Sequence, residues 1–265
     1  MSAEQWAEWH AEHERRRADP HGFLAVTGLN FLDGTPRRIP GAPGSWSTGP
    51  SGPVVSLADG ESLVVGSAAV AGDYSFGVIS ERGGINASFG DAVIEVAKRG
   101  GFDIVRPRHP SHSLLASYRG TPTFDFSDKW LLEGRFVPFA SARDVTVGAA
   151  VEGIEHVYSS PGQVTFAFAG ESLALTVFNG HTPGSLFALF TDETSGVTTY
   201  AANRSLAIDP PAADGTVVLD FNRATNLPCA YTEFATCPLP PAENRLPIAV
   251  EAGEKTPYEE GIRSA

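Results

Sequence analysis

The chain has 265 residues, of which 42% are hydrophobic, and it carries a formal net charge of −12 at pH 7. A chain of this length buries about three quarters of its unfolded surface, so it can fold without disulfides or a structural metal. Because the phosphate backbone of a nucleic acid requires a basic surface, the negative net charge predicts that the protein has no nucleic-acid partner.

The sequence also indicates a cellular compartment. Two cysteines in this length are typical of a reducing environment. The first residues lack the apolar core of a secretory signal, and no apolar run approaches the twenty or so residues of a membrane-spanning helix. We therefore expect a cytoplasmic protein without a membrane partner.

Residues 3–18 are predicted to form a helix. Ser2 and Gln5 make a capping-box pattern at its start, and Asp19-Pro20 ends it. Aromatic and histidine side chains recur along it at helical spacing and form one stripe, Trp6, Trp9, His10 and His13. The histidines have two interpretations, a metal-binding pair or part of a face docked on a β core, and we favour the second.

From His21 onward the pattern predicts short strands, and the 28 glycines and 20 prolines favour turns. Two hairpins are expected, one joining 54–57 to 63–65 and one joining 164–168 to 173–177 through Ala169-Gly170. Further strands are expected at 85–89, 92–98, 102–106, 113–118, 130–137, 145–151, 185–190, 197–201, 204–208 and 216–221. Strands about 8–12 residues apart predict a mainly-β fold, an antiparallel sandwich or barrel-like sheets.

The expected domain organisation is simple. Residues 1–20 form a helix docked on the core, and residues 21–265 form a single mainly-β domain. A subdivision near 125–145 stays open, although that region contains no obvious linker.

The segment from Asp220 to Lys255 contains both cysteines, Cys229 and Cys237. Prolines remove backbone donors and fix backbone angles along it, at positions 228, 238, 240, 241, 247 and 257. We therefore expect an irregular segment on a sheet edge or wrapped over the surface, which holds its side chains at low entropic cost.

This segment resembles the bacterial and archaeal family known as domain of unknown function 1684. The resemblance rests on the runs 190–192, 195–196, 199–200, 204, 220–224, 226–232, 235–241, 244–246 and 252–255. Weaker matches lie earlier, at Trp6, 22–24, 27–29 and 98–101. The resemblance implies that the C-terminal segment is the family's signature, and it transfers no reaction. Below, residues 220–255 are called the signature segment.

Three arginines suggest a site for a small anionic ligand. Arg204, Arg223 and Arg245 suit bidentate capture of a carboxylate or phosphate, with Lys255 as a further cation. An internal ion-pair network is the alternative. Side chains expected to orient or line the site are Asp220, Asn222, Asn226 and Tyr231; the first three also suit simple turn capping.

If the protein is an enzyme, hydrolysis or group transfer is the expected chemistry. Asp220 or Glu254 would act as a general base, or Cys229 as a thiolate nucleophile. A free cysteine between Pro228 and Ala230 is more often a small buried hydrophobe. We expect neither a metal nor another cofactor, because two cysteines eight residues apart make a poor zinc site.

Two alternatives differ in class. The signature segment can be a structural brace in a non-enzymatic β scaffold or interaction module. A flavin-binding split barrel is a third hypothesis, which the colour of the purified protein tests directly.

Overall fold

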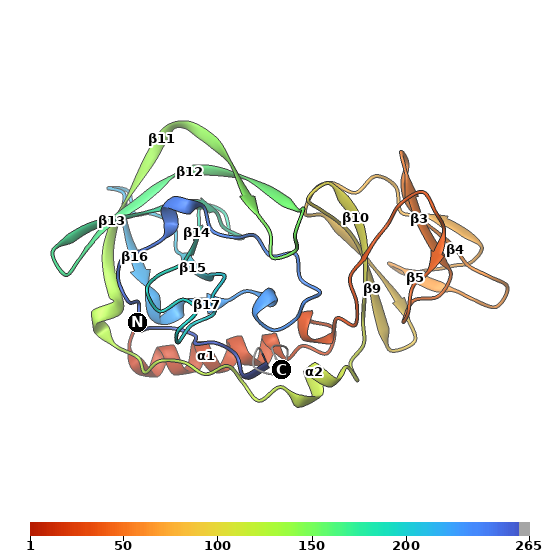
Figure 1. Ribbon diagram of the computed structural model, residues 1–265, viewed down its shortest axis with the longest axis horizontal. Coiled ribbons are helices and arrows are strands. Elements are labelled where there is room, and N and C mark those ends of the chain that lie inside the picture. Colours follow the sequence, from red (N-terminus) through yellow and green to blue (C-terminus); the bar gives the residue numbers. More distant parts are fainter. Residues whose placement is uncertain (260–265) are drawn as a thin grey trace. The chain divides into compact units, whose positions relative to one another are not determined.

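The structure is a computed structural model that describes residues 1–259, and it confirms a mainly-β antiparallel fold with one N-terminal helix (Figure 1). The described residues form three open sheets. Contacts divide the chain into two compact units: Met1–Glu14, Arg119–Tyr231 and the part from Cys237 onward, and Arg15–Tyr118 with Thr232–Thr236. The boundary at Arg119 lies shortly before the region 125–145. Among the described residues, no helix is long and apolar enough to cross a membrane.

The helix α1 (Ala3–Arg17) begins as its capping box predicts. The Ser2 N–H donates to Gln5 Oε1 at 2.8 Å, and the Gln5 N–H donates to Ser2 Oγ at 3.3 Å. Its aromatic stripe packs on the rest of the first unit, where Trp6 Nε1 donates to the carbonyl of Asn222 at 2.8 Å.

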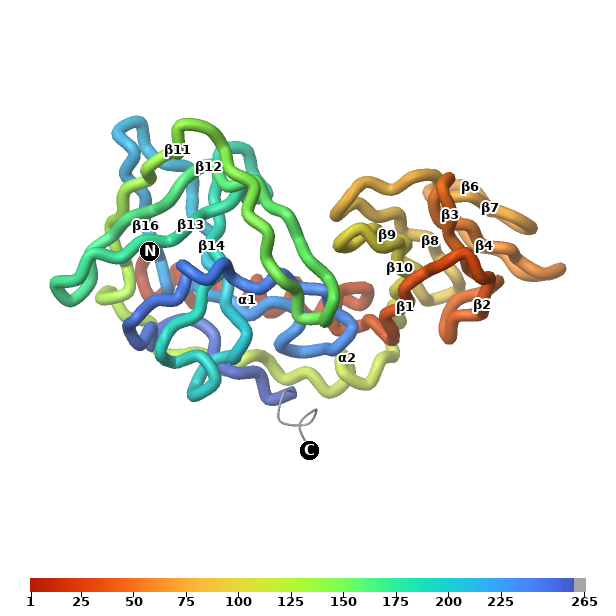
Figure 2. The backbone as a smooth tube through the Cα atoms, turned by 45° about the horizontal axis from the view of Figure 1, so that its top comes forward, coloured from red at the N-terminus to blue at the C-terminus, as the bar shows by residue number. Residues whose placement is uncertain are grey.

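The first unit contains a seven-stranded antiparallel sheet with the order β16-β11-β12-β13-β14-β15-β17. The strands are β11 (Leu131–Gly148), β12 (Glu155–Phe168), β13 (Glu171–Asn179), β14 (Leu186–Phe190), β15 (Arg204–Ile208), β16 (Thr216–Asp220) and β17 (Thr225–Asn226). The long strands β11 and β12 run side by side (Figure 2). Buried side chains of the sheet pack with Trp130, Phe221, Leu246 and Val250 in one core.

The predicted hairpin between 164–168 and 173–177 is confirmed. In β12 and β13, Val164 pairs with Leu175 and Phe166 with Leu173. The turn residues Ala169 and Gly170 have φ angles of 52° and 87°. Two consecutive positive angles match the twist of the flanking strands, which is why an Ala-Gly turn fixes this register.

The second unit is built from two sheets, with strand orders β1-β10-β9-β8-β5-β6 and β2-β3-β4-β7. The strands are β1 (Asn30–Phe31), β2 (Arg37–Arg38), β3 (Ser45–Gly49), β4 (Gly52–Ser56), β5 (Leu63–Val65), β6 (Ala68–Val70), β7 (Asp73–Ser75), β8 (Gly84–Phe89), β9 (Ala92–Arg99) and β10 (Phe102–Arg108). Side chains of both sheets, including Trp46, Val55, Ile94 and Val105, form one core. This is the sandwich arrangement of an antiparallel fold.

Several of the strands and hairpins predicted for the two units are wrong. Residues 54–57 and 63–65 belong to different sheets, because β4 pairs with β3 and β7 whereas β5 pairs with β6 and β8. Residues 113–118 contain a short helix, α2 (Ser113–Ser117), and residues 197–201 form no strand beyond an isolated bridge at Thr199. The predicted strands 130–137 and 145–151 are parts of one strand, β11, whose register shifts between Pro138 and Arg143.

Most of the signature segment is irregular, as its prolines predict. Apart from β17, its regular parts are three short 3-10 turns, η3 (Phe221–Arg223), η4 (Pro228–Ala230) and η5 (Ala242–Asn244). Residues 1–259 contain two further 3-10 turns, η1 (Phe23–Ala25) and η2 (Asp128–Trp130).

A buried carboxylate holds three arginines on β9 and β10. Glu95 is 6% exposed. Its carboxylate pairs with Arg99 at 3.1 Å, with Arg106 at 2.8 Å, and with Arg108. Burial raises the pKa of Glu95, but Arg106 and Arg108 outweigh it and lower this pKa from 4.5 to about 2. The second unit therefore depends on an ionised Glu95.

Candidate functional site

Glu254 lies in the signature segment with only 2% of its surface exposed. Its N–H donates to the carbonyl of Ala224 at 2.9 Å, and the Asn226 N–H donates to Glu254 Oε2 at 2.6 Å. Gly253 has a φ of 72°, and a Cβ at this residue would lie 2.4 Å from the carbonyl oxygen of Ala224. Only glycine fits there, so this close backbone approach places residue 254 beside Ala224.

Gly253→Ala is expected to destabilise the first unit by about 3 kcal/mol, because it adds left-handed strain to a backbone clash. Gly170→Ala is the matched control, since Gly170 has a φ of 87° with nothing within 4 Å of its Cβ position. This control is expected to cost about 1 kcal/mol. Urea unfolding of both variants provides the comparison, and equal losses would contradict the close approach described above.

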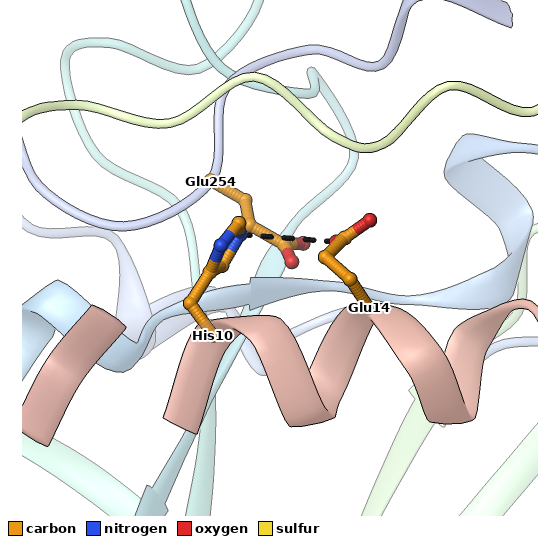
Figure 3. A group of neighbouring side chains, drawn as sticks. All are labelled: His10, Glu14 and Glu254. Atoms are coloured by element: carbon orange, nitrogen blue, oxygen red, sulfur yellow. Dashed lines mark ion pairs between the residues drawn. The ribbon is translucent and has the colours of Figure 1, made fainter. Parts of the chain in front are cut away.

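The helix α1 brings two further polar groups to Glu254. His10 and Glu14 are four residues apart and therefore share one face of the helix. His10 Nε2 lies 3.8 Å from Glu14 Oε1. One ligand atom from each of His10, Glu14 and Glu254 lies within 4.8 Å of the others, and the three side chains point toward one another (Figure 3). We call these three residues the His–Glu cluster.

Three more side chains surround the His–Glu cluster. His13 Nε2 lies 3.5 Å from Glu254 Oε1. The Tyr231 hydroxyl donates to Glu254 Oε2 at 3.5 Å and shares a 2.7 Å hydrogen bond with Thr121. Glu254 is therefore contacted on one oxygen by hydrogen-bond donors and on the other by an imidazole.

Tryptophans fix the two imidazole rings. Trp6 stacks on His10 with ring centroids 5.2 Å apart, and Trp9 stacks on His13 at the same separation. Both pairs are four residues apart on α1, so the stripe predicted from the sequence orients the rings as well as burying apolar surface.

Arg204 anchors the backbone that carries Glu254. It is 1% exposed, and its Nη2 donates to Asp192 Oδ2 at 2.8 Å and to the carbonyl of Val250 at 3.0 Å. Its Nη1 donates to the carbonyl of Ala252. Burial lowers the pKa of Arg204, and the charge of Asp192 opposes this shift. These hydrogen bonds hold the backbone of residues 250–252, so Arg204 positions the segment that leads to Glu254.

Asp220 and Asn222 also connect segments of the first unit. Asp220 Oδ1 accepts from the backbone N–H of Asn222 at 3.2 Å and from its Nδ2 at 3.0 Å. Asn222 pairs with the backbone of Ser127, accepting at 2.9 Å and donating at 3.1 Å. The turn-capping interpretation therefore describes the contacts of both residues, and the Asn222 carbonyl provides the acceptor for Trp6.

The remaining cations of the signature segment differ in their surroundings. The Arg223 guanidinium lies 4.9 Å from the centroid of Trp9, and the Lys255 ammonium lies 4.6 Å from that of Phe124; both residues are partly exposed. Arg245 is exposed. Asn226 Nδ2 donates to the carbonyl of Lys255 at 2.7 Å, so it ties β17 to the residues around Glu254.

Cys229 and Cys237 are free and buried. The Cys229 N–H donates to Cys237 Sγ at 3.3 Å, and the Cys229 carbonyl accepts from the Tyr200 hydroxyl at 3.0 Å. Cys229 is 4% exposed, which matches the interpretation of a small buried hydrophobe.

Of the residues predicted from the sequence, Asn226 and Tyr231 both contact Glu254 directly. The Arg204 side chain donates to the backbone of the same segment, at Ala252. His10 and Glu14 were not among the predicted site residues. The sequence does carry one signal for this pair, since His10 and Glu14 have the four-residue spacing of one helix face. This spacing alone did not reveal the cluster, because its third member, Glu254, lies 240 residues beyond Glu14 in the chain.

Comparisons with known proteins agree with the resemblance noted from the sequence. The family model described as "Protein of unknown function (DUF1684)" matches residues 116–255. An uncharacterised protein of Haloarcula marismortui, solved by NMR in solution, is 29% identical over 53% of this chain and 78% of its own, with a TM-score of 0.45. No curated protein matches the chain. Because the family model covers more than half of its residues, the chain belongs to the DUF1684 family.

Proposed function

We propose that this protein binds a small anionic molecule beside Glu254 and catalyses its hydrolysis or the transfer of a group from it. The observation that supports this most is the buried Glu254 carboxylate, 3.5 Å from the imidazole of His13. A carboxylate and an imidazole in this relation are a common acid–base pair of enzymes. His13 keeps 30% of its side chain exposed, so a ligand can reach the pair from solvent.

The proposed reaction uses water as the nucleophile. Glu254 accepts a proton from the water molecule, and the water oxygen forms a bond to an acyl or phosphoryl centre of the substrate. The bond to the leaving group then breaks, and protonated His13 donates a proton to that group. Tyr231, whose hydroxyl donates to Glu254 Oε2, holds the carboxylate in position.

Two cations near α1, rather than the two carboxylates of the His–Glu cluster, support the preference for an anion. Arg223 and Lys255 are partly exposed, and each lies over an aromatic ring. Arg223 and His13 both contact the ring of Trp9, so the guanidinium lies beside the aromatic stripe of α1. Arg204 is assigned no ligand contact, since its terminal nitrogens donate to Asp192 and to backbone carbonyls.

Glu254→Gln tests the proposal, because glutamine keeps an acceptor for the Asn226 N–H but cannot take up a proton. Hydrolysis of a panel of carboxylate-bearing esters and phosphate esters is expected to fall by about a hundredfold or more. Glu251→Gln is the matched control, three residues away and exposed, and it should retain wild-type rates. Equal rates for wild type and Glu254→Gln would overturn the proposal.

A structural role of the signature segment is the second candidate, and the hydrogen bonds of Asn244 favour it. Asn244 accepts from the backbone N–H of Thr176 at 2.8 Å and donates to the carbonyls of Thr176 and Leu189 at 2.8 Å. The side chain of Asn244, at the end of η5, thereby forms hydrogen bonds with backbone groups of β13 and β14. A purely bracing segment predicts no turnover by any member of the substrate panel.

A further inference from the structure

The His–Glu cluster has the composition of a metal site. It offers one imidazole nitrogen and two carboxylate oxygens, all within 4.8 Å of one another. Two of the ligands come from adjacent turns of α1, and the third comes from the signature segment (Figure 3). An imidazole nitrogen and two carboxylate oxygens are the ligand types that zinc takes from proteins, so the cluster can accept a cation at its centre.

A second observation concerns the ring nitrogen of His10. His10 Nε2 is shielded from solvent and has no hydrogen-bond partner among residues 1–259. Glu14 Oε1, at 3.8 Å, is too distant for a hydrogen bond. A buried polar atom without a partner costs free energy. The stacked ring of Trp6 keeps this nitrogen directed at the two carboxylates.

We infer that His10, Glu14 and Glu254 bind one divalent first-row transition-metal ion, zinc above all. Imidazole suits zinc better than it suits magnesium or calcium, whereas carboxylates serve all of these ions. Bonds of about 2.0–2.2 Å draw the three ligand atoms closer together than they lie now. This inference revises the sequence-based expectation that the protein binds no metal.

The surroundings of Glu254 match those of a metal ligand. The Asn226 N–H and the Tyr231 hydroxyl both contact Oε2. Hydrogen bonds of this kind orient a ligating carboxylate. Three protein ligands leave a coordination position for water, which is the arrangement of catalytic zinc sites. The ion would take up the Glu254 carboxylate as a ligand, whereas the proposed reaction uses that carboxylate as a base, so zinc binding does not rest on the proposed function.

Metal binding is measured directly on the full-length, untagged chain after treatment with a chelator. Isothermal titration with zinc chloride is expected to show one ion per chain, and cobalt(II) should produce visible absorption bands. His10→Ala and Glu14→Gln should each weaken binding by at least about tenfold. Both residues are partly exposed on α1, so these variants are expected to fold.

Controls match the two variants in residue type. His181→Ala changes an exposed histidine outside α1, and Glu8→Gln changes an exposed glutamate of α1; both should bind zinc as the wild type does. The absence of saturable zinc binding would overturn the inference. So would His10→Ala and Glu14→Gln variants that bind zinc as tightly as the two controls.

The same samples separate this inference from the proposed function. If zinc binds through His10 and Glu14 but no ester is hydrolysed, the metal site stands and the proposed catalysis fails. If hydrolysis persists after chelation and in His10→Ala, while no zinc binds, the acid–base proposal stands and the metal site fails.

Discussion

Replacing Arg204 by methionine is expected to destabilise the first unit by about 3–5 kcal/mol, the usual effect of breaking a buried ion pair from one side. Methionine fills much of the volume but leaves the charge of Asp192 buried, with 0% of its side chain exposed. It also leaves the carbonyls of Val250 and Ala252 without their donor. Thermal and urea unfolding, followed by circular dichroism, measure the loss.

Two further variants test the cause of this loss. Arg245→Met changes an exposed arginine of the same segment and should alter the free energy of unfolding by less than about 0.5 kcal/mol. Adding Asp192→Asn to Arg204→Met removes the uncompensated charge, so the double variant should be more stable than Arg204→Met alone. A double variant that is less stable would show that the ion pair is not the source of the effect.

The second large effect is expected from Glu95→Gln in the second unit. The ionised carboxylate contributes about 3 kcal/mol, given a pKa that falls from 4.5 to about 2. The variant loses this contribution and leaves three arginines around an uncharged amide. Hydrogen exchange of β9 and β10 amides measures the local loss, and Asp73→Asn, at an exposed site of the same unit, is the control.

The pH dependence of this effect has a definite sign. Because the folded-state pKa of Glu95 lies below its ordinary value, its stabilisation is present above about pH 4.5 and is lost as the pH falls toward 2. The difference between wild type and Glu95→Gln should therefore shrink on acidification. A difference that stays constant between pH 7 and pH 2.5 would contradict the assigned ion pairs.

Local patterns predicted local structure well. The capping box of Ser2 and Gln5 predicts the start of α1 because only a few neighbouring residues decide it. The turn at Ala169-Gly170 predicts the β12–β13 hairpin for the same reason. The hairpin predicted between 54–57 and 63–65 is wrong, because β4 pairs with β3 whereas β5 pairs with β8. The turn between the two runs contains no information about these more distant partners.

The candidate site was only partly predictable. The signature segment pointed to Glu254, Asn226 and Tyr231, which meet in the structure. Arg204 stood out as a ligand candidate because arginine suits bidentate capture of a carboxylate or phosphate, yet its donors serve Asp192 and the backbone. His10 and Glu14 join Glu254 through tertiary packing across most of the chain, and no short-range pattern records such a contact.

His10 and Glu14 lie on α1, whereas Arg204 lies on β15. Arg204 donates to Asp192 and to the carbonyls of Val250 and Ala252, and none of these hydrogen bonds involves α1. With the proposed metal site, exchanging His10 and Glu14 would therefore alter which ion is bound while leaving these anchoring hydrogen bonds in place.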